Sequence, residues 1–320
     1  MKCGYLNESA GDGFAVIPEN KDYRFQFLFM KYQGIYFMKK TLIALAVAAS
    51  AVSGMAHAWT DGDFNDSVDI GGSIIADDYR QKWSWAAGSD INEFNNTLNE
   101  LTEGGTKLTI TVNGDKPILL GKTNEAFSTP VLGGVGAIPL ITLSDATGEK
   151  QLLKGTEGAQ SGVGTFELEI KNRDTNEKIG MLRATMTGMA VAGIAGAENT
   201  GNLSALYAFK DTSIFYGGLV TERNSEMKDA NTAAAFTGKM GSLSATEILS
   251  QIKQVKPGVE SLTPQTSSVS ESMKYDNGNV VSAAYALGIE SGQTLEATFD
   301  KEITSSTKWT APLNISVSYN

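Results

Sequence analysis

The chain is nearly devoid of the two side chains on which many nucleophilic and metal-dependent enzymes rely. Cys3 is its only cysteine and His57 is its only histidine. Both lie in an N-terminal part that we expect to be absent from the mature chain. The mature chain therefore cannot contain a histidine-dependent triad, a cysteine nucleophile, or a zinc site with His or Cys ligands.

Long apolar runs and phosphate loops are missing as well. No segment after residue 58 reaches about 18 apolar residues, the length that a membrane-spanning helix needs. No G-x-x-x-x-G-K-[ST] motif occurs, which excludes a Walker phosphate loop. The glycine-rich run Gly133–Gly136 precedes Ile138-Pro139 rather than a helix, so we expect a turn there.

The apolar run near the N-terminus has the order of a secretory signal peptide. Met38-Lys39-Lys40 is basic, Thr41–Val52 is apolar, and Ala56-His57-Ala58 supplies the small residues of a cleavage site. We expect residues 38–58 to be the signal peptide, with Met38 as the true start. Residues 1–37 would then be a non-structural upstream extension, with an extended leader as the alternative, and we expect the mature chain to begin at residue 59.

Basic residues are outnumbered by acidic ones. The chain has 26 Lys and Arg against 36 Asp and Glu; without residues 1–58 the balance is 20 against 32, a formal charge of −12. Nucleic acid is therefore not an expected partner. Export would place the mature chain in an oxidising compartment, where disulfides can form, but without cysteine the mature chain has none.

Carboxylates offer the remaining chemistry. Acids that are close in sequence could bind calcium or act in glycoside hydrolysis. These are Asp77-Asp78 and the group Asp61, Asp63, Asp66 and Asp69. Their spacing matches no complete calcium loop, and solvated acids are the commoner case. We therefore expect no catalytic residue, no metal and no cofactor.

Alternation of apolar and polar residues predicts many short strands. Lys107–Val112 alternates cleanly and ends at Asn113-Gly114-Asp115, which has turn chemistry. Further short strands are predicted at Asp77–Trp85, Pro117–Leu120, Ala137–Leu143, Thr165–Ile170, Ile179–Met186, Val280–Leu287 and Thr294–Phe299. Gly, Asn and Asp separate them, which predicts an all-β sandwich or barrel. Trp83 and Trp85 share a face and are expected to line a core, although they could stack on a sugar instead.

The middle of the chain has helical patterns. Ala230–Phe236 is compatible with a short helix. Ser244 and Glu247 form a capping box, apolar residues follow at helical spacing, and Pro257-Gly258 ends the helix. A helical segment within a β-protein predicts an inserted subdomain, at about residues 186–262.

Two alternating segments lie at the ends of the mature chain. Leu313–Tyr319 alternates up to one residue from the C-terminus and leaves no length for a closing strand. Near the other end Phe64, Val68, Ile70 and Ile74 share one face of an extended strand. Both can be ordinary strands of one sandwich. Alternatively, the leading strand completes the sheet of another copy of the molecule.

Several runs give the chain a family resemblance. They are Gly62–Ile74, Ala76–Trp83, Gly104–Val112, Pro117–Gly121, Ile214–Leu219, Val280–Ile289 and Ala311–Asn314. In these runs the chain resembles the FaeG-type and ClpG-type major fimbrial subunits and adhesins, which build chaperone–usher fimbriae and capsule-like fibrillae of enteric bacteria. The runs span nearly all of the mature chain.

The resemblance implies an incomplete immunoglobulin-like sandwich, residues 76–320, that lacks its last strand. A periplasmic chaperone covers the gap first, and the N-terminal extension of the next subunit, residues 59–75, then replaces it. Phe64, Val68, Ile70 and Ile74 would be the donor-strand plugs. The C-terminal strand recognised by chaperone and usher would present Leu313, Ile315, Val317 and Tyr319. The cysteine pair of many pilins is absent, and Thr307 stands where they have a glycine.

In this family the insert carries glycan binding. The resemblance places the candidate sugar platform at Tyr207, Phe209, Lys210 and Asp211, an aromatic face with polar groups at its edge. Thr212 stands where some relatives have a basic residue, which puts their galactose preference in doubt. The alternative is that Tyr207 and Phe209 only pack the insert.

The resemblance implies a homopolymer of identical subunits, exported through the periplasm to the cell surface, that contacts a host-cell glycoconjugate. Two other classes remain open: an outer-membrane β-barrel channel and a secreted monomeric glycan-binding domain. The capped helix, the short uneven strands and the C-terminal Tyr319-Asn320 speak against the channel.

Overall fold

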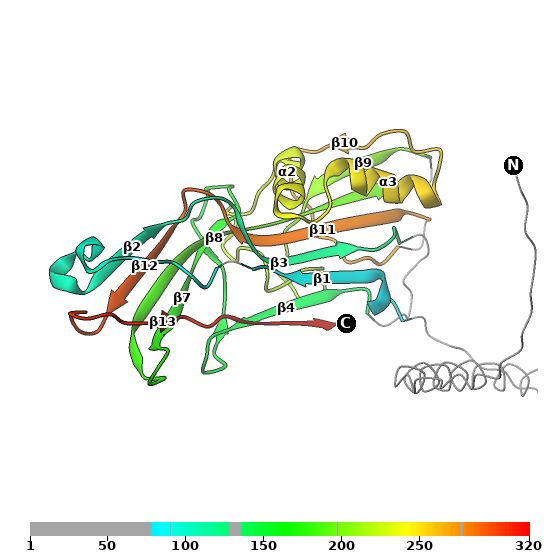
Figure 1. Cartoon of the computed structure of the whole chain (residues 1–320). Helices are drawn as coiled ribbons and strands as arrows, with labels where there is room; N and C mark the ends of the chain where they lie inside the picture. The colour runs from blue at the N-terminus through cyan, green and yellow to red at the C-terminus, as the bar shows by residue number, and fades with distance from the viewer. Residues whose placement is uncertain (1–77, 90, 128–135, 197, 276–277) are drawn as a thin grey trace, which may run out of the picture. The chain divides into compact units, whose positions relative to one another are not determined.

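Strands dominate the part of the chain that can be described. The computed structural model describes residues 78–89, 91–127, 136–196, 198–275 and 278–320 (Figure 1). The strands are β1 Trp83–Ala87, β2 Lys107–Thr111, β3 Lys116–Thr123, β4 Pro139–Ser144, β5 Lys150–Gln151, β6 Lys154–Gly155, β7 Val163–Asn172, β8 Lys178–Ala195, β9 Gly201–Ala205, β10 Thr263–Pro264, β11 Val280–Ile289, β12 Thr294–Phe299, β13 Trp309–Thr310 and β14 Asn314–Tyr319. The helices are α2 Ala230–Met240 and α3 Ala245–Val255, with short 3-10 helices at Arg80–Lys82, Leu98–Glu100 and Glu103–Gly105. The all-β class is confirmed.

The strands form two sheets. The larger runs β1-β3-β11-β8-β12-β2, with β7 and β9 also paired to β8, β6 and β13 paired to β7, and β10 paired to β9. The smaller is β14-β4-β5. Neighbours are antiparallel except for β9 and β10, and Tyr285 of β11 lies opposite Ala190 of β8. Among the helices described, none is long and apolar enough to cross a lipid bilayer.

The main core combines side chains of both sheets. It includes Ile141 and Leu143 of β4, Phe166, Leu168 and Ile170 of β7, and Tyr285 and Leu287 of β11. The Tyr285 hydroxyl is fully buried and donates a hydrogen bond of 2.7 Å to the carbonyl of Gly218. Burial raises the pKa of Tyr285, so the phenol stays protonated at physiological pH.

Helices α2 and α3 cover the other face of the larger sheet, over β8, β9 and β11 (Figure 1). Ile248 and Ile252 of α3 are fully buried there. The strand beneath has small residues because the helix packs closely: a Cβ at Gly193 would lie 2.5 Å from Cγ2 of Ile248. The second half of β8 and all of β11 are thus covered on both faces, and β11 is buried at every residue.

Capping fixes the helix ends. The Ser244 hydroxyl accepts from the Glu247 N–H, while the Glu247 carboxylate accepts from the Ser244 N–H at 2.7 Å. The predicted capping box is confirmed. The Asp229 carboxylate caps α2 by accepting from the Thr232 N–H at 2.7 Å, and the helix is followed by Gly241, whose φ of 103° suits glycine.

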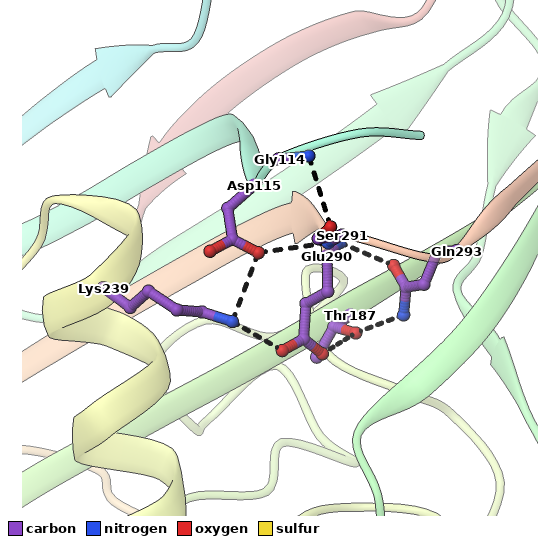
Figure 2. A network of polar contacts seen from close by, with 7 residues as sticks. All are labelled: Gly114, Asp115, Thr187, Lys239, Glu290, Ser291 and Gln293. Atoms are coloured by element: carbon purple, nitrogen blue, oxygen red, sulfur yellow. Dashed lines mark hydrogen bonds and ion pairs between the residues drawn. The ribbon is translucent and has the colours of Figure 1, made fainter. Parts of the chain in front are cut away.

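A polar network ties the end of α2 to two strand-connecting loops (Figure 2). The Lys239 ammonium lies 2.8 Å from the Glu290 carboxylate and 3.3 Å from that of Asp115. Thr187, Gln293, Ser291 and Gly114 extend the network through hydrogen bonds. Lys239 is partly exposed, so the ion pairs add little stability by themselves.

Two predicted strand boundaries are wrong by a wider margin than the others. The strand expected over Asp77–Trp85 begins only at Trp83, because the Asp78 carboxylate accepts from the Arg80 N–H at 3.0 Å and favours a 3-10 turn. The strand expected to end at Met186 continues to Ala195. The insert boundaries at about residues 186–262 stay a prediction.

Candidate functional site

Strand β14 has an outer edge with which no described strand pairs, and we call it the open edge. Asn320 and Ile138 exchange two backbone hydrogen bonds, of 3.1 and 3.4 Å. In antiparallel pairs, such hydrogen-bonded positions alternate with positions whose N–H and C=O groups point away from the partner. Ile315, Val317 and Tyr319 therefore direct their backbone groups away from β4, and no strand in the described ranges pairs with that side.

The backbone hydrogen bonds on the other side of β4 also indicate that Val317 and Tyr319 point outward. Its Pro139 carbonyl accepts from the Phe215 N–H, and its Ile141 N–H donates to the Tyr216 carbonyl, both at 2.8 Å. These two residues face Tyr319 and Val317 across the ladder. Because their backbone groups are used on the side away from β14, those of Tyr319 and Val317 must point outward.

The side chains of β14 are incompletely covered. Ile315, Val317 and Tyr319 are only half-buried against the main core, whereas the polar residues between them are exposed. Leu313, just before the strand, is also half-buried. The edge thus offers open backbone groups beside a row of apolar side chains that another strand could cover.

Strand β1 is an edge strand of the larger sheet and has the same property. The residues that flank β1 are hydrogen-bonded to the residues that continue the β1–β3 pairing. The Gly88 N–H donates to the Ile118 carbonyl at 3.0 Å, and the Asn124 N–H donates to the Lys82 carbonyl at 2.8 Å. The alternation directs the backbone groups of Trp83 and Trp85 away from β3. No other strand in the described part of the chain pairs with β1.

A tryptophan brings the two edge strands together. The Trp85 indole N–H donates to the Tyr319 hydroxyl at 2.9 Å, although 234 positions separate them in sequence. Trp83 is buried, with ring centroids 5.6 Å from Phe127 and 5.5 Å from Phe215. The core-lining interpretation of these tryptophans is confirmed for Trp83, and Trp85 spans the space between the two edges.

A groove of about 720 Å³ lies between the segments that flank these edges, Ile91–Leu101 after β1 and Ser305–Ala311 before β14. Its apolar wall includes Phe94, Leu98, Phe299, Ile303 and Trp309. Leu98 is 48% exposed, so part of this wall is accessible to solvent. Sequence reasoning missed this groove; the signal was the spacing of apolar residues by three or four in a polar segment, from Ile91 through Phe94 and Leu98 to Leu101.

The predicted donor plugs Phe64, Val68, Ile70 and Ile74 lie outside the described residues, as does the whole segment 59–75. Their role stays a prediction. The predicted C-terminal row, Leu313, Ile315, Val317 and Tyr319, lies on or next to the open edge.

The predicted sugar platform is brought together on one loop. The rings of Tyr207 and Phe209 stack with centroids 4.9 Å apart and planes at 30°, and both are half-buried. Lys210 and Asp211 are exposed beside them. The Asn320 amide donates to the Asp211 carbonyl at 3.1 Å, so the C-terminus of the chain contacts this loop.

Of the carboxylates considered for metal binding or hydrolysis, Asp78 lies in the described part of the chain, whereas Asp61, Asp63, Asp66, Asp69 and Asp77 lie outside it. Asp78 pairs with Arg80 at 2.6 Å. Hydrogen bonds from the Arg80 side chain lower the pKa of Asp78 to about 2, so this carboxylate is ionised and occupied. No group of three potential metal-ligating residues (His, Cys, Asp or Glu) occurs among the described residues.

The loop Tyr207–Gly217, which carries the predicted sugar platform, is bonded to β4, and Gly217 permits this close approach. We expect Gly217→Ala to destabilise the fold. Its φ is +84°, and a Cβ would lie 2.1 Å from the Ile141 carbonyl oxygen. A backbone oxygen cannot move aside cheaply, so the loss should be roughly 2–4 kcal/mol, measured as a lower Tm. Gly114→Ala is the matched control, because Gly114 also has a positive φ but no atom within 4 Å of an added Cβ. Equal losses for both variants would contradict the close approach.

Comparisons with known proteins point in one direction. Residues 38–320 match the family model described as "Fimbrial, major and minor subunit". The chain is 53% identical to K88 fimbrial protein AC of Escherichia coli over 285 residues, covering 88% of this chain and 100% of the relative, and K88 fimbrial protein AD matches to the same extent. F41 fimbrial protein of Escherichia coli is 31% identical over 293 residues, with the same coverage.

Proposed function

Because this chain belongs to the family of fimbrial major and minor subunits, we propose that it is the repeating subunit of a fimbria whose subunits complete one another by strand donation. A periplasmic chaperone holds each subunit first, and an outer-membrane usher joins the subunits at the cell surface. The chain has no enzymatic role in this proposal. A second proposed role is adhesion to a host-cell glycoconjugate.

The observation that carries the assembly proposal is the open outer edge of β14. Its outward backbone groups and half-buried Ile315, Val317 and Tyr319 can accept one more strand, as in β-strand addition. Each apolar side chain buried there would contribute roughly 1.5–3 kcal/mol. Each new ladder hydrogen bond would add about 0.5–1.5 kcal/mol. A joint of this kind is stable without a disulfide.

We propose residues 59–75 of the neighbouring subunit as the donor. Phe64, Val68, Ile70 and Ile74 share one face of an extended strand, so all four can enter the space beside β14 together. The groove of about 720 Å³, which is lined by Ser305–Ala311 of the segment before β14, has room for a bulky side chain. The proposal includes that each subunit alone is an incomplete β-sandwich, which the donor strand completes. In the family this sandwich is immunoglobulin-like.

The adhesion proposal depends on the stacked pair Tyr207 and Phe209. Sugars bind to aromatic faces when polar groups at the rim accept or donate hydrogen bonds, and the exposed Lys210 and Asp211 are such groups. The half-buried state of both rings leaves part of their surface accessible.

Proline at the open edge tests the assembly proposal. In Val317→Pro the lost N–H is one that points away from β4, so the subunit should fold and still pair with β4. The joint loses one hydrogen bond of about 0.5–1.5 kcal/mol, and fibres should dissociate into monomers at a lower temperature. The measurement is the fraction of monomer after heating purified fibres in detergent.

The control is a proline at Ser316, whose backbone N–H points toward β4 instead of away from it. Ser316 directs its N–H to Thr142 of β4, so Ser316→Pro should prevent the subunit from accumulating at all. Val317→Pro fibres as heat-stable as the parent fibres would refute donation at this edge.

A further inference from the structure

The loop Tyr207–Gly217 and the open strand β14 are attached to opposite sides of the same strand. On one side of β4, Val317 of β14 lies opposite Ile141. On the other side, the Ile141 N–H donates to the Tyr216 carbonyl at 2.8 Å, and Leu140 and Tyr216 form an isolated parallel bridge. The loop is therefore only one strand away from the edge at which we place the donor.

A second connection runs through aromatic rings. Phe215 of the loop is fully buried, and its ring centroid lies 6.1 Å from that of Trp85 in an edge-on arrangement. Trp85 in turn donates to the Tyr319 hydroxyl at 2.9 Å. Phe215 has a φ of 65°, a strained backbone conformation for a bulky residue, which persists only where the surroundings hold it.

A third connection is the last residue of the chain. The Asn320 side-chain amide donates to the Asp211 carbonyl at 3.1 Å, while its backbone carbonyl accepts from Gly136 and Ile138. Tyr319 and Asn320 thus both touch the loop or its support, and both belong to the end of an edge strand. Chain termini and edge strands open locally at low free-energy cost unless they are held on both sides.

We propose that filling the open edge of β14 orders the loop Tyr207–Gly217, so that the candidate receptor surface is fully formed only in polymerised subunits. The element that changes is the end of β14. A donor strand suppresses its local opening, and the contacts of Tyr319 and Asn320 carry this order to Trp85, Phe215 and Asp211. This inference rests on the proposed function and adds regulation to it.

Hydrogen exchange of the full chain, measured on monomers and on fibres, tests the proposal. In fibres, peptides that contain residues 314–320 should exchange more slowly, because the outward N–H groups become bonded. Peptides that cover residues 206–218 should slow as well. Slower exchange of β14 with unchanged exchange of the loop overturns the coupling but leaves strand donation intact. Unchanged exchange of β14 overturns strand donation at this edge, and the coupling with it.

Two mild substitutions separate coupling from a merely structural role. Tyr319→Phe removes the oxygen that accepts from Trp85, and Asn320→Ala removes the amide that donates to Asp211. Each should make loop exchange in fibres about two- to tenfold faster, the factor expected from one lost hydrogen bond. Ser318→Ala is the control, because Ser318 is exposed on the other face of β14. If these residues have only a structural role, the substitutions should speed exchange of the loop equally in monomers and in fibres. If they couple the loop to the edge, the substitutions should reduce the difference in loop exchange rate between monomers and fibres. An unchanged difference in loop exchange rate for both variants overturns the proposal.

Discussion

A chain without residues 59–75 is expected to reach the periplasm, bind its chaperone and form no fibres. None of the described strands and helices includes a deleted residue, and β14 with its open edge remains in the chain. What it removes is the strand that would cover Ile315, Val317 and Tyr319 of the next subunit. Electron microscopy of cells that express the whole fimbrial gene cluster, together with recovery of the chaperone-bound subunit, measures both parts of this result.

Substitutions on the two faces of the proposed donor strand provide the control for that deletion. Ser67→Lys and Asp69→Lys change residues of the opposite parity, which would face solvent in the joint, so fibres should form. Val68→Lys and Ile70→Lys place charges among apolar side chains and should prevent assembly, as the deletion does. Fibres grown from the deleted chain, or equal assembly by both pairs of variants, would rule out residues 59–75 as the donor.

Tyr207→Ala is expected to abolish binding to host cells while fibres remain as abundant as before. The ring of Tyr207 stacks on Phe209 at the loop surface and is not part of the β14 ladder. Loss of a central aromatic contact costs about 2 kcal/mol or more, roughly a 30-fold loss of affinity at each site. The measurement is the number of fluorescently labelled fibres bound per host epithelial cell.

Two further variants sharpen this prediction. Tyr207→Phe keeps the ring and should retain most binding if stacking is the main contribution. Lys301→Ala changes an exposed residue outside the loop and should leave binding unchanged. Wild-type binding by Tyr207→Ala fibres would show that Tyr207 and Phe209 only pack the loop.

The sequence predicted strands best where one face is buried. The strand predicted at Thr294–Phe299 is β12 to the residue, and its apolar and polar residues alternate. In β8 the alternation stops after Met186, because α2 and α3 cover the face that is solvated before that point. With both faces buried, a strand of Gly, Ala and Met has no period-two signal, so its second half could not be recognised.

The candidate site was predicted in part for a similar reason. Alternation placed Ile315, Val317 and Tyr319 on one face, and the structure confirms that arrangement. The partnership of Trp85 with Tyr319 and the attachment of Tyr216 to β4 join residues that are far apart in sequence. Contacts of this kind depend on topology, which local periodicity does not determine.

The helical layer also bears on how the surface of the fibre can vary. Ile248 and Ile252 anchor α3 to the sheet, while Thr246, Ser250 and Lys253 face solvent. None of these exposed residues lies on β1 or β14, the strands at the proposed joint. Substitutions at these three positions are therefore expected to leave the proposed joint unchanged, and sequence variation should concentrate on the outer face of α3 rather than along the C-terminal strand.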